Sequence, residues 1–211
     1  MARPSQNQDL ALLEAGRTLY PLHGCAGLSV RMLAQQAGVN IGMFHYHFKN
    51  KDAFIQRLLQ DWYENLFSQL ELEVNQDLEV VQKLRHALLL IARLMRQHGA
   101  WFGRVWQDAG LGHQVALAFL QRNGSRHVQV LLGLLQQAMA EQKIPAMPPV
   151  QAMTFLMGAV VAPMFMAPRV SQLGIAPAEL QQILSASVVS DQGIQQRLDL
   201  ALQGLCSGCN Q

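Results

Sequence analysis

The chain has 211 residues, of which half are hydrophobic and 14% are charged. A chain of this composition can bury a sizeable core, which excludes a disordered protein and leaves room for one medium-sized or two small domains. Six of the 16 basic residues but only three of the 14 acidic residues lie in residues 1–60. This mild excess of positive charge at one end is compatible with a nucleic-acid partner without establishing one.

Three features of the sequence indicate a cytoplasmic protein without a membrane anchor. The first ten residues are polar and lack the hydrophobic run of a signal peptide. The three cysteines, Cys25, Cys206 and Cys209, suit a reducing compartment, because an odd number makes a poor disulfide framework. The apolar run 152–167 is shorter than the roughly 20 residues that span a bilayer and contains Pro163, so a buried helix is expected there.

The first predicted element is a helix over residues 9–20. Its apolar residues recur at intervals of three and four, and Pro21 should end or distort it. Arg17 and His23 are expected to be solvated.

Two short helices, predicted over residues 30–37 and 41–47, follow this first helix. Ser29 and Asn40 are placed to cap them, because their side chains can accept a backbone N–H. Gly38 lies between them and supplies the backbone freedom that a tight turn needs. The pair is predicted to form a helix-turn-helix that reads the major groove of DNA.

Side chains of the second short helix are unusual for a plain surface, because they are small, apolar-tipped or hydrogen-bonding rather than charged. By geometry a glycine lets the backbone approach DNA, a methionine can touch thymine methyls, and tyrosine or histidine can bind phosphates or base edges. Lys49 and Lys51 lie at the start of a further helix, whose free N–H groups suit a phosphate, and Lys51 is expected to be the phosphate anchor. His47 is the member that could instead be a packing residue. The residues expected to contact DNA are Ser29, Arg31, Asn40, Gly42, Met43, His45, Tyr46, His47, Lys49 and Lys51.

The same residues resemble the DNA-binding domain of TetR-type transcriptional repressors. The resemblance rests on Ala34-x-x-Ala37-Gly38-Val39-Asn40, on the segment HYHFKNKDAF over residues 45–54, and on the preceding helix with Tyr20 four residues before Gly24. It covers about the first quarter of the chain and implies an all-helical homodimer whose remainder binds a small molecule and releases DNA. Met32, Ile41 and His45 depart from the family's usual residue types, which leaves the operator sequence and phosphate contacts open.

The remainder of the chain shows helical periodicity throughout and no alternating strand pattern. The predicted class is therefore all-α, with a three-helix DNA-binding domain over 1–50 and a larger helical domain over 51–211 for ligand binding and dimerisation. The helix that starts at Asp52 is apolar on two sides, so it is expected to connect the two domains and to act as the lever of a switch. Further helices are predicted over residues 84–98, 100–110, 114–142, 149–167, 178–189 and 194–205, with a break over 168–177.

Aromatic and methionine side chains in this larger domain exceed what a thin helical body needs. Together they suit an adaptable apolar pocket, since methionine fills irregular space and aromatic walls enclose hydrophobic ligands. Asp108, otherwise isolated from other carboxylates, and His113 are further polar groups that could orient an apolar or aromatic effector. The residues expected to line the pocket are Trp62, Met95, His98, Trp101, Phe102, Trp106, Gln107, Phe119 and Met157.

A homodimer is expected because two recognition helices must reach major grooves about 34 Å apart, or a multiple of that distance. The helix after Pro149 and those after Pro177 are more apolar than one side of packing requires. The family resemblance implies a four-helix interface between subunits made by such helices.

Two other classes of function remain open. A thiol- or metal-responsive regulator would use Cys25, Cys206, Cys209 or the scattered histidines, although no ligand-spaced pair predicts a metal site. A helical enzyme is the weaker alternative, because the sequence contains no phosphate-binding glycine loop, nucleophile elbow or paired carboxylates. No cofactor is expected.

Overall fold

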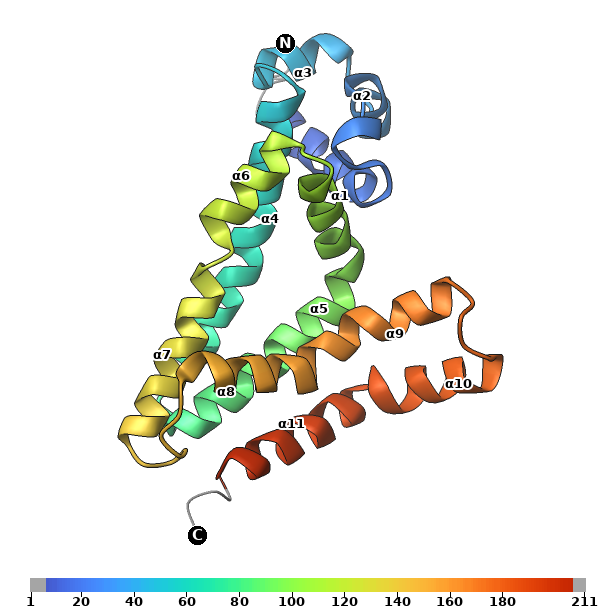
Figure 1. Ribbon diagram of the computed structural model, residues 1–211. Helices are drawn as coiled ribbons and strands as arrows, with labels where there is room; N and C mark the ends of the chain where they lie inside the picture. Colours follow the sequence, from blue (N-terminus) through green and yellow to red (C-terminus); the bar gives the residue numbers. More distant parts are fainter. Residues whose placement is uncertain (1–6, 207–211) are drawn as a thin grey trace. The chain divides into compact units, whose positions relative to one another are not determined.

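A computed structural model describes residues 7–206, and every regular element in that part is helical, which confirms the predicted all-α class. Two of the elements are single π-helical segments within longer helical runs. In chain order the elements are α1 Gln8–Gly27, α2 Val30–Ala37, α3 Ile41–His47, α4 Lys51–Val74, α5 Val80–Gly110, α6 Gln114–Asn123, α7 Arg126–Ala140, α8 Pro149–Leu156, η1 Met157–Val161, α9 Ala162–Gln172, α10 Ala178–Ile183, η2 Leu184–Val188 and α11 Asp191–Cys206 (Figure 1).

By packing, the described residues divide into two compact units. The N-terminal unit comprises residues 7–65 and 100–124, and therefore contains α1 to α3, the first part of α4, the end of α5, and α6. The C-terminal unit comprises residues 66–99 and 125–206. The predicted functional boundary after residue 50 stays a prediction. The two units found by packing divide α4 and α5 within their length, so they do not test a boundary at residue 50.

Aromatic side chains form the centre of the N-terminal unit. Phe44 of α3 lies 5.4 Å from Phe54 of α4 between ring centroids, and Phe48 lies 4.9 Å from Phe54. Tyr20 and Leu33 are also fully buried, from α1 and α2. These contacts fix α3 by its inner face and leave its outer face for other contacts.

Pro21, which is predicted to end or distort the first helix, does not end it, because α1 continues to Gly27. Proline removes one backbone N–H, but its fixed φ is compatible with a helix. The interruption comes three residues later, at Gly24, where φ is 63° and ψ is −169°.

Two other predicted helix boundaries have different outcomes. Residues 100–110 belong to α5, but a kink at His98 (φ −112°, ψ 20°) divides α5 into two helical stretches close to the predicted break. The predicted long helix over 114–142 is instead divided into α6 and α7 at Gly124. Asn123, Gly124 and Ser125 are all weak helix formers, and the Asn123 side chain donates to the Phe119 carbonyl and pairs with the Gln60 amide.

The apolar run is longer than predicted, since α8, η1 and α9 form a continuous helical run over Pro149–Gln172. The run is 24 residues long and contains an 18-residue window with a mean hydropathy of 1.7, which would suffice to cross a membrane, although an apolar helix of a soluble protein can pass the same test. Pro163 does not break the run, because the preceding π turn, in which Ala162 N–H donates to the Met157 carbonyl, accommodates it.

The burial predicted for this run holds for only one face. Leu156, Val160 and Met164 are buried, whereas Phe155 is 49% and Met166 60% exposed. The predicted break over 168–177 is correspondingly too long, because α9 continues to Gln172.

Candidate nucleic-acid interface and effector site

The turn between α2 and α3 has the geometry expected of a helix-turn-helix. The Met32 N–H donates to the Ser29 hydroxyl oxygen at 3.2 Å, so Ser29 caps α2 as predicted. Gly38 adopts left-handed angles (φ 65°, ψ 29°), which end α2. The Gly42 N–H then donates to the Asn40 side-chain oxygen at 2.8 Å, so the predicted cap of α3 is also present.

The outer face of α3 carries the predicted DNA contacts. Gly42, His45 and Tyr46 are exposed, and Tyr46 is 72% exposed despite its large ring. Met43 and His47 are half-buried. A short helix with a fixed inner face and a protruding tyrosine is suited to entering a groove.

His47 fits the packing alternative better than its neighbours do. Its ring lies 5.0 Å from that of Tyr46 in an edge arrangement. Its Nε2 atom is buried and has no hydrogen-bond partner within residues 7–206. The ring therefore supports the Tyr46 side chain in this structure, and a DNA contact from His47 stays a prediction.

Of the three cationic residues predicted to contact DNA, two are exposed and can reach a DNA phosphate, and the third already donates a hydrogen bond within the protein. Arg31 and Lys49 are exposed. Lys51 Nζ donates to the Cys25 carbonyl at 2.8 Å and is half-buried. Its hydrogen-bond partner thus lies at the end of α1, so its predicted role as phosphate anchor competes with a structural one.

Two residues of the N-terminal unit were missed or misjudged from the sequence. Ile41, the first residue of α3, is 48% exposed beside Gly42, so it can present an apolar group to a thymine methyl. Asp108 is neither isolated nor free to orient an effector: it is buried and accepts hydrogen bonds from the Tyr20 hydroxyl and the Cys25 N–H. No sequence spacing could reveal a contact between residues more than 80 positions apart.

Part of the predicted effector site is an aromatic cluster in the N-terminal unit. Trp62 and Trp101 stack with 4.8 Å between ring centroids, and Phe102 packs edge-on against Trp62 at the same separation. Phe119 packs instead against Tyr63 of α4, with 5.9 Å between centroids.

The other predicted lining residues are exposed or belong to the C-terminal unit. Trp106 and Gln107 lie on the exposed side of α5. Met95, His98 and Met157 are half-buried and belong to the C-terminal unit. Burial lowers the pKa of His98, which favours a neutral imidazole at the kink of α5.

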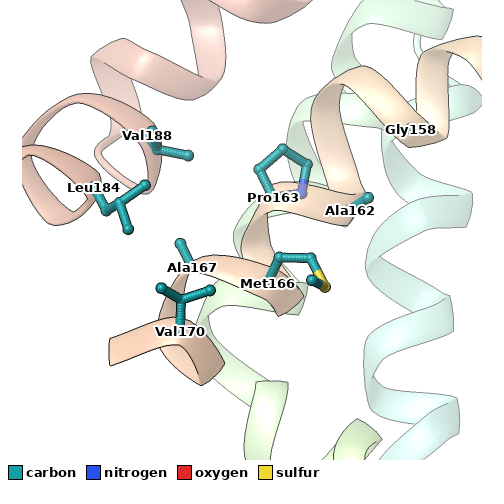
Figure 2. A pocket seen from close by; sticks show the side chains of 8 residues that line it. All are labelled: Gly158, Ala162, Pro163, Met166, Ala167, Val170, Leu184 and Val188. Atoms are coloured by element: carbon teal, nitrogen blue, oxygen red, sulfur yellow. The ribbon is translucent and has the colours of Figure 1, made fainter. Parts of the chain in front are cut away.

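The C-terminal unit contains an open apolar groove of about 290 Å³, shown in Figure 2. None of the residues predicted to bind an effector lines it. A second hollow, between α5, α7 and α8, is a closed seam lined by leucines and Met153, with no room for a water molecule. The groove is lined by Gly158, Ala162, Pro163, Met166, Ala167, Val170, Leu184 and Val188.

The fold and the α2–α3 geometry define a helix-turn-helix DNA-binding protein. Residues 12–58 match the family described as bacterial regulatory proteins, tetR family. Residues 12–58 are therefore a DNA-binding domain of the TetR type, as the sequence resemblance implied.

Known relatives agree with this family. The transcriptional repressor KstR2 of Mycolicibacterium smegmatis is 29% identical over 70 residues, which cover 33% of this chain and about a third (34%) of the relative. Two solved structures share the fold over nearly the whole chain. The regulator FadR from Bacillus subtilis, in complex with stearoyl-CoA, has 15% identity and a TM-score of 0.66 and covers 92% of this chain and 98% of its own. The ketosteroid regulator KstR2 of Mycobacterium tuberculosis has 19% identity and a TM-score of 0.64 and covers 94% of each chain.

Proposed function

We propose that the protein is a cytoplasmic, homodimeric repressor that binds an operator through α3 and leaves it when an apolar small molecule binds. One observation carries the DNA-binding part: α3 is anchored by the buried Phe44 and presents Gly42, His45 and Tyr46 outward. No carboxylate lies on that outer face, so it can approach phosphates without like-charge repulsion.

A second copy of the chain is the proposed occupant of the apolar surface on α8 to α11. Phe155 and Met166 are exposed on α8 and α9, and the groove beside Met166 is almost purely apolar. A large exposed apolar patch on one protomer typically marks an interface. Helix pairs from two protomers would cover it as a four-helix bundle and set the distance between the two recognition helices.

The proposed effector is an apolar or aromatic molecule. The support is the stacked cluster around Trp62 and Trp101, the closed leucine seam beside Met153, and the stearoyl-CoA bound by the FadR relative. An acyl chain or a steroid skeleton could insert between such apolar side chains without leaving buried polar groups unpaired. The effector would act by binding the DNA-free state more tightly than the DNA-bound state.

Of the alternative regulators, a thiol sensor at Cys25 is disfavoured by the side chain's surroundings. Cys25 is buried, and desolvation together with the Asp108 carboxylate raises the pKa of its thiol to about 12, so the reactive thiolate is scarce at neutral pH. Cys206 is half-buried, and Cys209 lies outside the described residues. Within the described chain, no three His, Cys, Asp or Glu side chains are grouped to hold a metal.

Selection of fragments from sheared genomic DNA tests the proposed DNA binding. Wild-type protein is expected to enrich a fragment with two-fold symmetry, because a homodimer presents two identical recognition helices. Tyr46→Ala should weaken binding to that fragment about tenfold or more, since it removes the most prominent group on α3. Leu72→Ala is the matched control, because Leu72 is 71% exposed but lies near the end of α4.

If Tyr46→Ala and Leu72→Ala bind the fragment equally well, α3 is not part of the DNA interface. A wild-type protein that enriches no fragment would contradict the proposed function as a whole.

A further inference from the structure

The last turn of α1 is broken at Gly24, and the break separates two groups that a continuous helix would join. In an uninterrupted helix the Cys25 N–H donates to the Pro21 carbonyl. Here the Cys25 N–H donates to Asp108 Oδ2 at 2.8 Å, and the Pro21 carbonyl accepts from Arg104 Nε at 3.3 Å. Each half of the broken pair is thus satisfied by a side chain of α5.

Additional contacts complete this arrangement, here called the α1 clamp and formed by Arg104 and Asp108 on α5. The Tyr20 hydroxyl donates to Asp108 Oδ2 at 2.9 Å, and Arg104 Nη2 donates to the Leu22 carbonyl at 3.2 Å. Residues four apart lie on the same face of a helix, and the two charged groups are 4.0 Å apart. One turn of α5 therefore binds four polar groups of α1.

The end of α1 and the α1 clamp pack closely against each other. Asp108 is only 2% exposed, and a buried carboxylate is tolerated when hydrogen-bond donors and a positive charge surround it. A Cβ atom at Gly24 would lie 2.7 Å from both Arg104 Cδ and Asp108 Oδ1. Burial and the Asp108 carboxylate raise the pKa of the Tyr20 hydroxyl, which keeps it a neutral donor.

The clamped turn leads directly into the DNA-reading helices. Leu28 N–H donates to the Gly24 carbonyl, and Ser29, the next residue, caps α2. The Cys25 carbonyl also accepts from Lys51 at the start of α4. The same turn of α1 is thus tied to both ends of the segment that contains α2 and α3.

We propose that Asp108 is a positioning residue for DNA binding, which holds the end of α1 and thereby orients α2 and α3. This inference rests on the proposed function, because it assigns a role in the same operator-binding site. Asp108 itself touches no DNA and acts through the α1 turn alone.

The test compares Asp108→Leu with Asp108→Asn by hydrogen exchange and operator affinity. Asparagine keeps a side-chain oxygen that can accept from both Tyr20 and Cys25, whereas leucine removes the acceptor. In Asp108→Leu the Cys25 and Leu28 amides are expected to exchange about tenfold faster or more, and operator affinity to fall about tenfold. In Asp108→Asn both quantities should stay within about threefold of wild type, because the remaining side-chain oxygen can accept both hydrogen bonds that Asp108 Oδ2 accepts.

General loss of stability is distinguished by the amides of residues 54–59 in α4, which should keep their wild-type exchange rates. Unchanged exchange at Cys25, an equal rise in exchange in α4, or operator affinity that stays at the wild-type value would overturn the proposal. If Asp108→Leu does not fold, Tyr20→Phe removes one of the two donors to Asp108, and is expected to change the same readouts in the same direction by a smaller factor.

The outcome also separates this inference from the proposed function. If wild-type protein binds no DNA fragment selectively, the proposed function fails. The exchange rates at Cys25 and Leu28 would still show whether Asp108 stabilises the last turn of α1.

Discussion

At the scale of single residues, Gly24 and Gly38 both have a positive φ, of 63° and 65°, but differ in ψ and in surroundings. Gly38 has the left-handed helical ψ of 29°, which other residues can adopt at a cost, whereas Gly24 has a ψ of −169°, in a region open essentially to glycine alone. A Cβ at Gly38 would meet nothing within 4 Å, whereas one at Gly24 would overlap the side chains of the α1 clamp. Gly24 therefore combines greater backbone strain with steric overlap, and Gly38 has backbone strain alone.

Alanine substitutions at these two positions are expected to differ in stability. Gly38→Ala should lower the free energy of unfolding by about 1 kcal/mol, from backbone strain. Gly24→Ala should cost about 1–3 kcal/mol more, since its backbone angles are essentially restricted to glycine and the clamp must also shift. Urea unfolding of both variants checks the difference, and equal losses would show that neither the strain nor the clamp at Gly24 matters.

Residue roles were predictable where neighbours in sequence determine them. Ser29, Gly38 and Asn40 cap and turn the helices as expected, because caps and tight turns depend on residues within three positions. Asp108 was not predictable, because its partners come from α1, and its burial follows only from the packing of α5.

At the scale of elements, the start of α4 bears two lysines with different surroundings. Lys49 is exposed just before the helix, whereas Lys51 is half-buried and bonds to the Cys25 carbonyl. The helix itself is capped by the Asn50 side-chain oxygen, which accepts the Ala53 N–H at 2.8 Å. Of these two lysines, Lys49 is therefore the one whose substitution tests phosphate binding without disturbing α1.

Lys49→Ala is expected to reduce the slope of the salt dependence of operator binding by about one unit, because one phosphate loses its cationic partner, without changing stability. Lys51→Ala should lower the free energy of unfolding by about 1 kcal/mol, because the Cys25 carbonyl loses its donor. Operator titrations at several salt concentrations and urea unfolding separate the two effects. A Lys49→Ala slope equal to that of wild type would show that this side chain binds no phosphate.

Helix existence was predicted more successfully than helix continuity. The periodicity of the sequence indicates helices because each must bury one face. It does not show that α1 passes through Pro21, that the kink at His98 joins two helical stretches, or that a π turn accommodates Pro163. The π turn, for example, depends on the bond from the Ala162 N–H to the Met157 carbonyl, which no apolar periodicity indicates.

At the scale of the whole molecule, the prediction of a regulator is confirmed, while the effector site stays a prediction. Trp62, Trp101 and Phe102 do cluster, but Trp106 is 63% exposed and the apolar groove is lined by other residues. Composition identifies side chains suited to an apolar pocket, but many of them serve as core. The sequence predicts that the helix after Pro149 is more apolar than one side of packing requires, but not which of its residues stay exposed, because an apolar sequence looks the same whether its own chain or a second copy covers it.

The central claim is that an apolar effector controls the binding of a dimer to its operator. Fluorescence anisotropy of the enriched DNA fragment, titrated with wild-type protein and then with stearoyl-CoA, free fatty acids and a ketosteroid, tests it most directly. We predict two protomers per two-fold symmetric site and release of the DNA by at least one of these ligands, with operator affinity lowered about tenfold or more. Tight operator binding that none of these apolar ligands changes, or a complex with a single protomer, would contradict it.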